Sequence, residues 1–145
     1  MSPPLILDAD GLDALTEQPP PERLRALLSE AWERRSDVLV PALVCAECCR
    51  GAGRTRAVET ALARYRDGRR RRPAVRVIST DFSLARQVGS ILHSAGTGTA
   101  DVVDAHCVAV AVMHGGGIVV TADPGDIRRL ASAVPVVKIV TRPAR

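Results

Sequence analysis

Short runs of apolar residues alternate along the chain with longer stretches in which apolar residues recur every three or four positions. Short runs of this kind predict buried strands, and the longer periodic stretches predict amphipathic helices. The predicted strands cover residues 5–7, 38–40, 75–79, 118–121 and 136–140. The predicted helices cover 22–35, 42–50, 55–67, 81–94 and 101–114, with a short one ending at 131. The segment after residue 8 is predicted to be a loop.

Strands that alternate with helices are typical of a parallel sheet, and several of these strands are apolar on both faces. The pattern therefore predicts an α/β fold, a three-layer α/β/α sandwich with a mainly parallel sheet of four to five strands. The 145 residues are 46% hydrophobic, which suffices for one buried core. No repeat or linker interrupts the chain, so we expect a single domain over residues 1–145.

The charge of the chain comes almost entirely from arginine. The formal net charge is +4, and Lys138 is the only lysine. Arginine suits bidentate contact with phosphate, although an arginine-rich coding preference would give the same bias. The three aromatic residues are too few for a base-stacking platform. No apolar run is long enough for a membrane helix and no secretion signal is visible, so a cytoplasmic protein with no membrane contact is expected.

Four cysteines lie in apolar, helix-like segments: Cys45, Cys48, Cys49 and Cys107. Secreted mini-proteins place cysteines in turn-rich frameworks instead, so reduced thiols are expected. A zinc site that also used His106 would need paired ligand turns with glycine, and these are missing. The thiols are therefore interpreted as small buried apolar side chains.

Four acidic residues stand out by their positions. Asp8 and Asp123 directly follow predicted strands, Asp104 lies in the first turn of a predicted helix, and Glu47 interrupts an apolar helix. Ligands of open parallel sheets bind beyond the carboxyl ends of the strands, so these four side chains could meet in one cleft. Clustered carboxylates repel one another unless a cation lies between them. Oxygen ligands favour Mg²⁺ or Mn²⁺ over zinc.

Three of the four acids also admit a structural role: Asp8 as a turn cap, Asp123 as a helix cap and Asp104 as a helix-start acid. The same holds for their acidic neighbours. Asp101 has the stronger claim to capping the helix that begins near it, and is kept as a possible further metal ligand. Asp10 is another possible ligand. Asp126 is interpreted as a solvated acid in the first turn of a helix.

Several short strings, taken together, resemble the motifs of a known family. In chain order they are Leu7-Asp8, Glu47 followed by Arg50-Gly51, Asp104-Ala105, and Val120-Thr121-Ala122-Asp123. Together they cover nearly the whole chain, and the sequence resembles the PIN-domain nucleases, above all the VapC-type toxins of bacterial toxin-antitoxin pairs.

This resemblance implies an endoribonuclease that uses Mg²⁺ or Mn²⁺, forms a homodimer and is silenced by a cognate antitoxin. It implies that Asp8, Glu47, Asp104 and Asp123 are the catalytic, metal-binding quartet. Thr121 matches a hydroxyl residue that often precedes the last acid, although a threonine at a strand end is also common. The run Arg69, Arg70, Arg71 and Arg72 is either a solvated helix end or a contact for RNA phosphates.

Two other classes share part of the pattern. The string Asp8-Ala9-Asp10-Gly11 is similar to the opening motif of haloacid-dehalogenase-like phosphatases, in which Asp8 would be the nucleophile. Leu12 then stands where a small hydroxyl residue is expected, and the lysine comes after the final acids. A non-catalytic receiver-like signalling domain would use Asp8 and Asp10 for Mg²⁺, with Lys138 near a phosphoryl group. Neither class gives Glu47 or Asp104 a role.

Overall fold

The computed structural model describes residues 2–69 and 71–145. Within these residues five strands form one sheet in which every pairing is parallel. The strands are β1 (Leu5–Leu7), β2 (Val38–Pro41), β3 (Val75–Ile78), β4 (Gly116–Val120) and β5 (Lys138–Arg142). Their order is β3-β2-β1-β4-β5, so the direction of winding reverses between β1 and β4. Ligand sites of doubly wound sheets lie at such a reversal.

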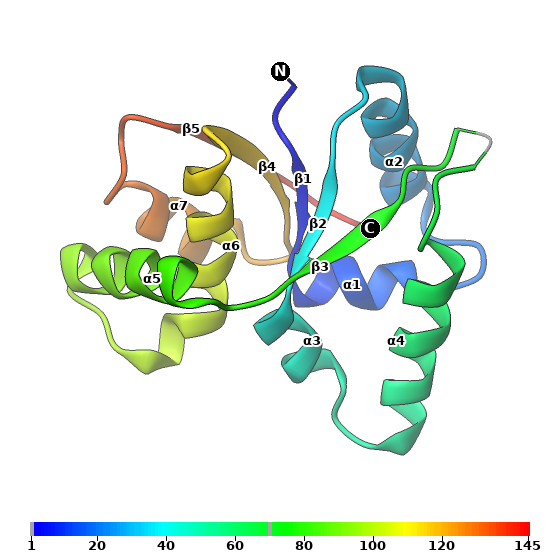
Figure 1. Ribbon diagram of the computed structural model, residues 1–145, viewed down its shortest axis with the longest axis horizontal. Coiled ribbons are helices and arrows are strands. Elements are labelled where there is room, and N and C mark those ends of the chain that lie inside the picture. Colours follow the sequence, from blue (N-terminus) through cyan, green and yellow to red (C-terminus); the bar gives the residue numbers. More distant parts are fainter. Residues whose placement is uncertain (1, 70) are drawn as a thin grey trace.

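Helices cover both faces of the sheet, as the alternating pattern predicted (Figure 1). One side carries α1 (Ala9–Leu15), α2 (Glu22–Arg34), α3 (Ala42–Cys48) and α4 (Ala52–Arg64). The other carries α5 (Phe82–Ala95), α6 (Val102–Met113) and α7 (Pro124–Ala131), with a short 3₁₀ turn at Thr99–Asp101 before α6. The predicted α/β/α sandwich is confirmed. In the described part of the chain no helix is both long and apolar enough to cross a membrane.

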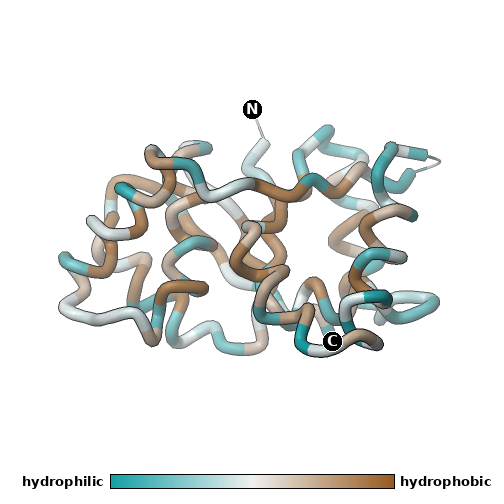
Figure 2. The backbone as a smooth tube through the Cα atoms, turned by 60° about the horizontal axis from the view of Figure 1, so that its bottom comes forward, coloured by the Kyte–Doolittle hydropathy of each residue, from teal (hydrophilic) through white to brown (hydrophobic). Residues whose placement is uncertain are grey.

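The central strands are buried on both faces, which explains their continuous apolar runs. Ile6, Leu7 and Leu39 have no exposed surface. Helix α6 is buried over residues 105–111, where alanines alternate with valines and let the helix lie close against the sheet. Apolar segments accordingly run through the middle of the molecule, and polar segments lie mostly at its periphery (Figure 2).

The segment after Asp8 is a helix and not the predicted loop. Asp8 is the N-cap of α1, and Leu12 and Leu15 are fully buried. At seven residues α1 is too short to show a helical period, and Gly11 suggests a turn. The structure gives this glycine another role, because a Cβ there would lie 3.2 Å from the Val120 carbonyl oxygen.

The glycines after α6 also differ from the prediction. They were expected to form a break, with the strand beginning at Ile118, but β4 begins at Gly116. Gly116 has φ +136°, and a Cβ there would lie 2.8 Å from the Lys138 carbonyl oxygen. A Cβ on Gly117 would lie 2.9 Å from Ile6 Cδ1. The glycines thus allow β4 to approach its neighbours closely.

Two further boundaries shift. Strand β5 covers Lys138–Arg142 and not 136–140, because Val136 is 92% exposed and lies before the strand. Helix α4 begins at Ala52, three residues earlier than predicted, and ends at Arg64. The last strand was predicted from the β-branched residues at 136–140, but the first two of these residues pair with no neighbouring strand.

Candidate acidic site

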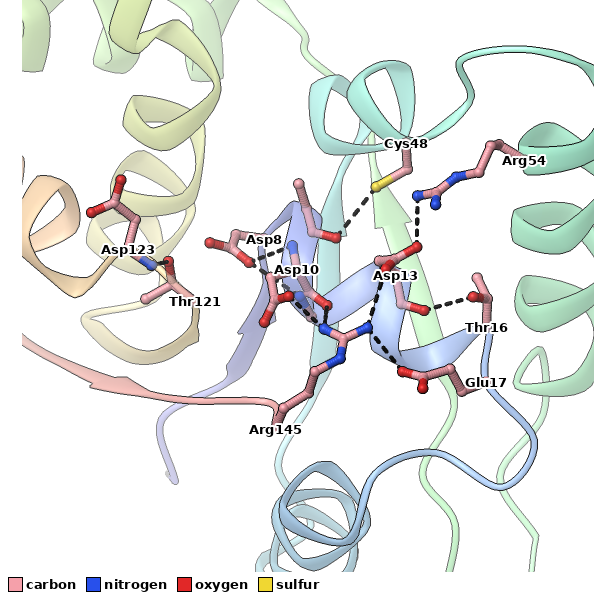
Figure 3. A network of polar contacts seen from close by, with 12 residues as sticks. Asp8, Asp10, Asp13, Thr16, Glu17, Cys48, Arg54, Thr121, Asp123 and Arg145 are labelled. Carbon is pink, nitrogen blue, oxygen red and sulfur yellow. Dashed lines mark hydrogen bonds and ion pairs between the residues drawn. The ribbon is translucent and has the colours of Figure 1, made fainter.

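Asp8 lies at the carboxyl end of β1, where it is 6% exposed. Its Oδ1 atom accepts hydrogen bonds from the backbone N–H groups of Asp10, at 3.0 Å, and Gly11, at 3.1 Å (Figure 3). The same carboxylate therefore caps α1 and is held in one orientation. Burial raises the pKa of Asp8, and the hydrogen bonds from Thr121 and Gly11 oppose this rise.

The end of β4, which leads to Asp123, lies beside the end of β1, which leads to Asp8. Leu7 pairs with Val120, and the backbone N–H of Asp8 donates to the Val120 carbonyl at 3.1 Å. Thr121 follows, 2% exposed, and its Oγ1 accepts a hydrogen bond from the Asp123 backbone N–H at 2.9 Å. The Thr121 hydroxyl is thus bonded to the backbone of Asp123, and the same side chain lowers the pKa of Asp8.

Asp104 stands in the first turn of α6, half-buried. Its pKa is raised to about 6, first by burial and then by the negative charges of four other carboxylates. In decreasing order these belong to Asp8, Asp126, Asp123 and Glu47. The other three acids that the sequence singled out are therefore near enough to influence the charge of Asp104, and a fifth acid, Asp126, does so too.

That additional acid is Asp126, in the first turn of α7. The carboxylate oxygens of Asp101, Asp104 and Asp126 lie within 4.8 Å of one another. Asp126 also hydrogen-bonds the carboxyl group of Asp123, and this bond is the main cause of the raised pKa of Asp123. Asp126 lies in the first turn of α7 as predicted, with its side chain 40% exposed, but it also belongs to this cluster. Its position one helical turn after Asp123 is the signal that could have identified it.

Asp101 occupies the N-cap position of α6 as expected, but its side chain makes no hydrogen bond to the start of that helix. It accepts a short hydrogen bond from the Thr97 hydroxyl and forms an ion pair with Arg129 at 3.1 Å. These contacts lower the pKa of Asp101. Arg129 also contacts Asp126, at 3.3 Å. One guanidinium group therefore joins two of the three clustered acids, Asp101 and Asp126.

Glu47 occupies a more peripheral place. It lies in the last turn of α3 and its side chain is exposed. Its charge is the weakest of the four that raise the pKa of Asp104. The neighbouring Cys48 thiol donates to the Ala9 carbonyl at 3.4 Å, which fastens the end of α3 to the start of α1. Glu47 is therefore held at the rim of the acidic site.

Asp10 adds to the rise in the pKa of Asp8 through its negative charge, and it is itself paired with an arginine (Figure 3). Its carboxylate pairs with Arg145 at 2.5 Å, and the same guanidinium contacts Asp13 at 3.1 Å and Glu17 at 2.8 Å. Asp13 also pairs with Arg54 at 2.6 Å. The carboxylate that the sequence offered as a further metal ligand is thus already neutralised by an arginine. Nothing in the local sequence indicates this partner, because it lies 135 residues away.

The donor set of the site fits a hard divalent cation. The groups brought together are carboxylates and a threonine hydroxyl, and the pKa values of Asp8 and Asp104 are raised first by burial and then by the charge of neighbouring carboxylates. Within the described residues the cysteines are free thiols, and none belongs to the cluster of possible ligands. His106 is buried, with Nδ1 bonded to the Val102 carbonyl at 2.7 Å.

The arginines that follow α4 have different surroundings. Arg72 donates to the Arg64 carbonyl at 2.9 Å and lies over the Tyr65 ring, 4.7 Å from its centre, so it stabilises the loop that follows α4. Arg69 and Arg71 are exposed. Arg70 lies outside the described residues. A contact of this run with RNA stays a prediction for its exposed members.

The fold and the acidic site define an α/β protein with a cluster of carboxylates at the point where the winding of its parallel sheet reverses. Comparison with known protein families identifies the family. The family model for the PIN domain matches residues 12–133. This chain belongs to the PIN domain family, so the family resemblance of the sequence is confirmed. Proteins of this family are generally nucleases. No match was found among curated proteins.

Solved structures with a similar fold include three complexes. VapBC2 from Rickettsia felis bound to a DNA fragment from its promoter has a TM-score of 0.64 and 13% identity, covering 97% of this chain and 98% of that one. FitAB bound to the IR36 DNA fragment has a TM-score of 0.62 and 20% identity, covering 97% and 94%. DNA-bound VapBC from Salmonella typhimurium has a TM-score of 0.58 and 22% identity, covering 97% and 98%. These similarities establish the fold.

Proposed function

We propose that this protein is an Mg²⁺- or Mn²⁺-dependent endoribonuclease and the toxin of a type II toxin-antitoxin pair. The observation that carries the proposal is the environment of Asp104, whose pKa is about 6 beside four other carboxylates at the carboxyl edge of the sheet. Asp8, Glu47, Asp104 and Asp123 are assigned to the catalytic metal site. Asp126 joins them, because it completes the close cluster with Asp104.

The residues divide the work by their surroundings. A bound divalent ion would supply neutralisation of charge on the phosphate oxygens and a lowered pKa of attacking water. Asp8 offers a carboxylate already oriented by the α1 backbone amides, which reduces the entropy lost on binding. Thr121 fixes the spacing between Asp8 and the backbone of Asp123. The charge that raises the pKa of Asp104 is relieved when a cation is bound.

The proposed partners follow from the family and from the neighbours. VapBC and FitAB are complexes of two components bound to DNA. By analogy, we propose that this chain binds a cognate antitoxin, and that the pair in turn binds DNA. We also propose a homodimer. RNA is the proposed substrate, and the positive charge of the chain outside the acidic site agrees with a polyanionic one.

The two alternative classes lose support. A receiver-like domain needs Lys138 beside the acids, but Lys138 begins β5 opposite Gly116, at the other end of the sheet from Asp8. Both alternatives also use Asp10, whose carboxylate is paired with Arg145. A phosphatase with Asp8 as nucleophile would form an aspartyl-phosphate adduct, and a metal-dependent nuclease would not. Mass spectrometry after incubation with a phosphate ester would detect it.

The direct test incubates purified protein with structured RNAs, with and without Mn²⁺, beside an Asp8→Asn variant. Asparagine keeps an oxygen for the start of α1 and removes the charge. Exposed Asp67, which follows α4, provides an Asp67→Asn control. We expect Mn²⁺-dependent cleavage by the wild type and the control, with a loss of at least about 100-fold in Asp8→Asn, which is about 2.7 kcal/mol of transition-state stabilisation. Equal cleavage by all three proteins would refute the proposal.

A further inference from the structure

The cations of this chain fall into two groups. In the described residues Arg54, Arg76, Arg129 and Arg145 are paired with carboxylates. The other described lysine and arginine residues have no carboxylate partner within 4.0 Å in this part of the chain, and four of them gather around one surface: Arg34, Arg35, Lys138 and Arg142. Unpaired cations that lie together raise the local positive potential and attract anions.

These four residues and His114 line two cavities of about 380 and 370 Å³, which share Arg34 and His114. We call them together the cationic groove. Its walls come from the end of α2, the glycine turn into β4, and β5, and its apolar lining includes Pro3, Ile118 and Val140. One carboxylate, that of Asp37, also lines the groove and is paired with Arg76. The turn carries no side chains at 115–117, which leaves room in the groove.

The groove leads toward the acidic site. Lys138, Val140 and Arg142 are alternate residues of β5, so their side chains share one face of the strand. Lys138 pairs with Gly116 at the start of β4, and Arg142 pairs with Val120 at its end. The two cations are about 13 Å apart along the strand. The Arg142 carbonyl accepts the backbone N–H of Thr121, the residue that contacts Asp8, at 2.9 Å.

A simpler role exists for part of this arrangement. Strand β5 is an edge of the sheet, and charged side chains on an edge strand prevent pairing with another sheet. That role accounts for Lys138 and Arg142. It does not require Arg34, Arg35 and His114 to converge on the same cavities from two other elements.

A nuclease with this acidic site needs positive charge elsewhere, because clustered carboxylates repel a polyanionic substrate. A bound cation offsets part of that repulsion, and the remaining attraction must come from side chains outside the cluster. Guanidinium groups match phosphate oxygens in a bidentate geometry. An acidic protein segment would find the same charges, but its path along β5 would end at the repelling acidic site.

We propose that the cationic groove binds phosphates of the RNA segment that flanks the one in the acidic site. This inference rests on the proposed ribonuclease function and adds the path of the substrate. Phosphate contacts of this kind position a nucleic acid without reading its sequence. The groove therefore sets affinity and register for long RNAs, whereas a short oligonucleotide that fills the acidic site alone does not use it.

The test compares the full chain with an Arg34→Gln/Lys138→Gln/Arg142→Gln variant. Exposed arginines outside the groove provide a control with the same charge change, Arg23→Gln/Arg56→Gln/Arg86→Gln. Binding of a long single-stranded RNA and of a hexanucleotide is measured in EDTA over a range of NaCl concentrations. Matching circular dichroism melts establish that all three proteins are folded.

For the long RNA, the groove variant should bind at least about tenfold more weakly. Its slope of log affinity against log salt should fall by about 2, since each lost phosphate contact removes about 0.7 for single strands. Hexanucleotide binding should stay equal. Equal slopes for the groove variant and the control would overturn the inference. So would polyglutamate binding that is lost in the groove variant while its RNA affinity stays unchanged, because the groove would then belong to an acidic protein segment.

Cleavage by the unmodified protein with Mn²⁺ separates the two proposals. If the wild type cleaves RNA and the groove variant binds like the control, the groove inference alone fails. If the wild type cleaves no RNA, the proposed function fails, and the groove inference fails with it.

Discussion

Asp123 donates its backbone N–H to the Thr121 hydroxyl at 2.9 Å, and the same side chain lowers the pKa of Asp8. Thr121→Val keeps the shape of this buried residue and removes the hydroxyl that acts on both acids. We expect a fall in kcat of about tenfold, about 1.4 kcal/mol, with KM little changed, because the acids lose their fixed spacing. Thr121→Ser retains the hydroxyl and should keep most of the activity. A valine variant with normal kcat would contradict this role.

Asp104 makes the metal-free protein sensitive to pH. Its pKa is raised from 3.8 to about 6, so its ionised form is disfavoured in the folded state. The resulting destabilisation is absent below about pH 4, develops between pH 4 and 6, and is complete above pH 6. Asp104→Asn should therefore raise Tm by a few degrees at pH 8 in EDTA, and not at pH 3.5. Thermal melts at the two pH values test this.

Binding of Mn²⁺ should make the wild type melt at a higher temperature than Asp104→Asn, the reverse of the order expected in EDTA. With saturating Mn²⁺ at pH 8 the wild type gains Tm through ligand binding, whereas Asp104→Asn gains less. Asp67→Asn, on an exposed residue, is the control and should follow the wild type in every condition. A control that rose in Tm as Asp104→Asn does would show that general charge reduction, and not the acidic site, is responsible.

Asp10 provides a negative prediction about the metal site. Because Arg145 already neutralises its carboxylate, Asp10→Asn should leave the affinity for Mn²⁺ within about twofold of the wild type. Asp8→Asn should weaken it by about tenfold or more. Isothermal titration with Mn²⁺ distinguishes the two variants. Equal losses would make Asp10 a ligand and the contact with Arg145 a secondary one.

Gly117 tests the close approach of β4 to its neighbours. An added Cβ would lie 2.9 Å from Ile6 Cδ1 and 3.1 Å from the Ala111 Cβ, so Gly117→Ala should destabilise the fold by about 1–3 kcal/mol. Gly53, inside α4, has nothing within 4 Å of the same position. Gly53→Ala should instead stabilise by up to about 1 kcal/mol. Urea unfolding measures both changes, and a neutral Gly117→Ala would mean that β4 shifts without cost.

The parts of the fold that sequence could predict are those recorded in continuous local patterns. Apolar runs such as Leu5–Leu7 are buried on both faces, and this burial fixes a strand in a covered parallel sheet. Asp8 and Asp123 were predictable as neighbours because carboxyl ends of adjacent parallel strands meet at one edge. In contrast, α1 depends on its Asp8 cap and on burial of Leu12, which leave no periodic signal in so short a segment.

The rest of the site depends on how elements pack. Asp126 approaches Asp104 because α7 contacts α6, and Asp101 turns to Arg129 of α7 instead of capping its own helix. The pairing of Asp10 with Arg145 joins opposite ends of the sequence. Such partners are set by the tertiary arrangement, so periodicity and motif spacing carry no record of them.

The carboxylate of Asp8 has two duties, since it begins α1 and belongs to the acidic site. A substitution that deletes the side chain would therefore unravel the first turn of α1 along with the proposed chemistry, and Ala9, whose carbonyl accepts the Cys48 thiol, would shift with it. Loss of function in such a variant would report on architecture as much as on catalysis. Selection against change at this position would thus act twice, through folding and through turnover.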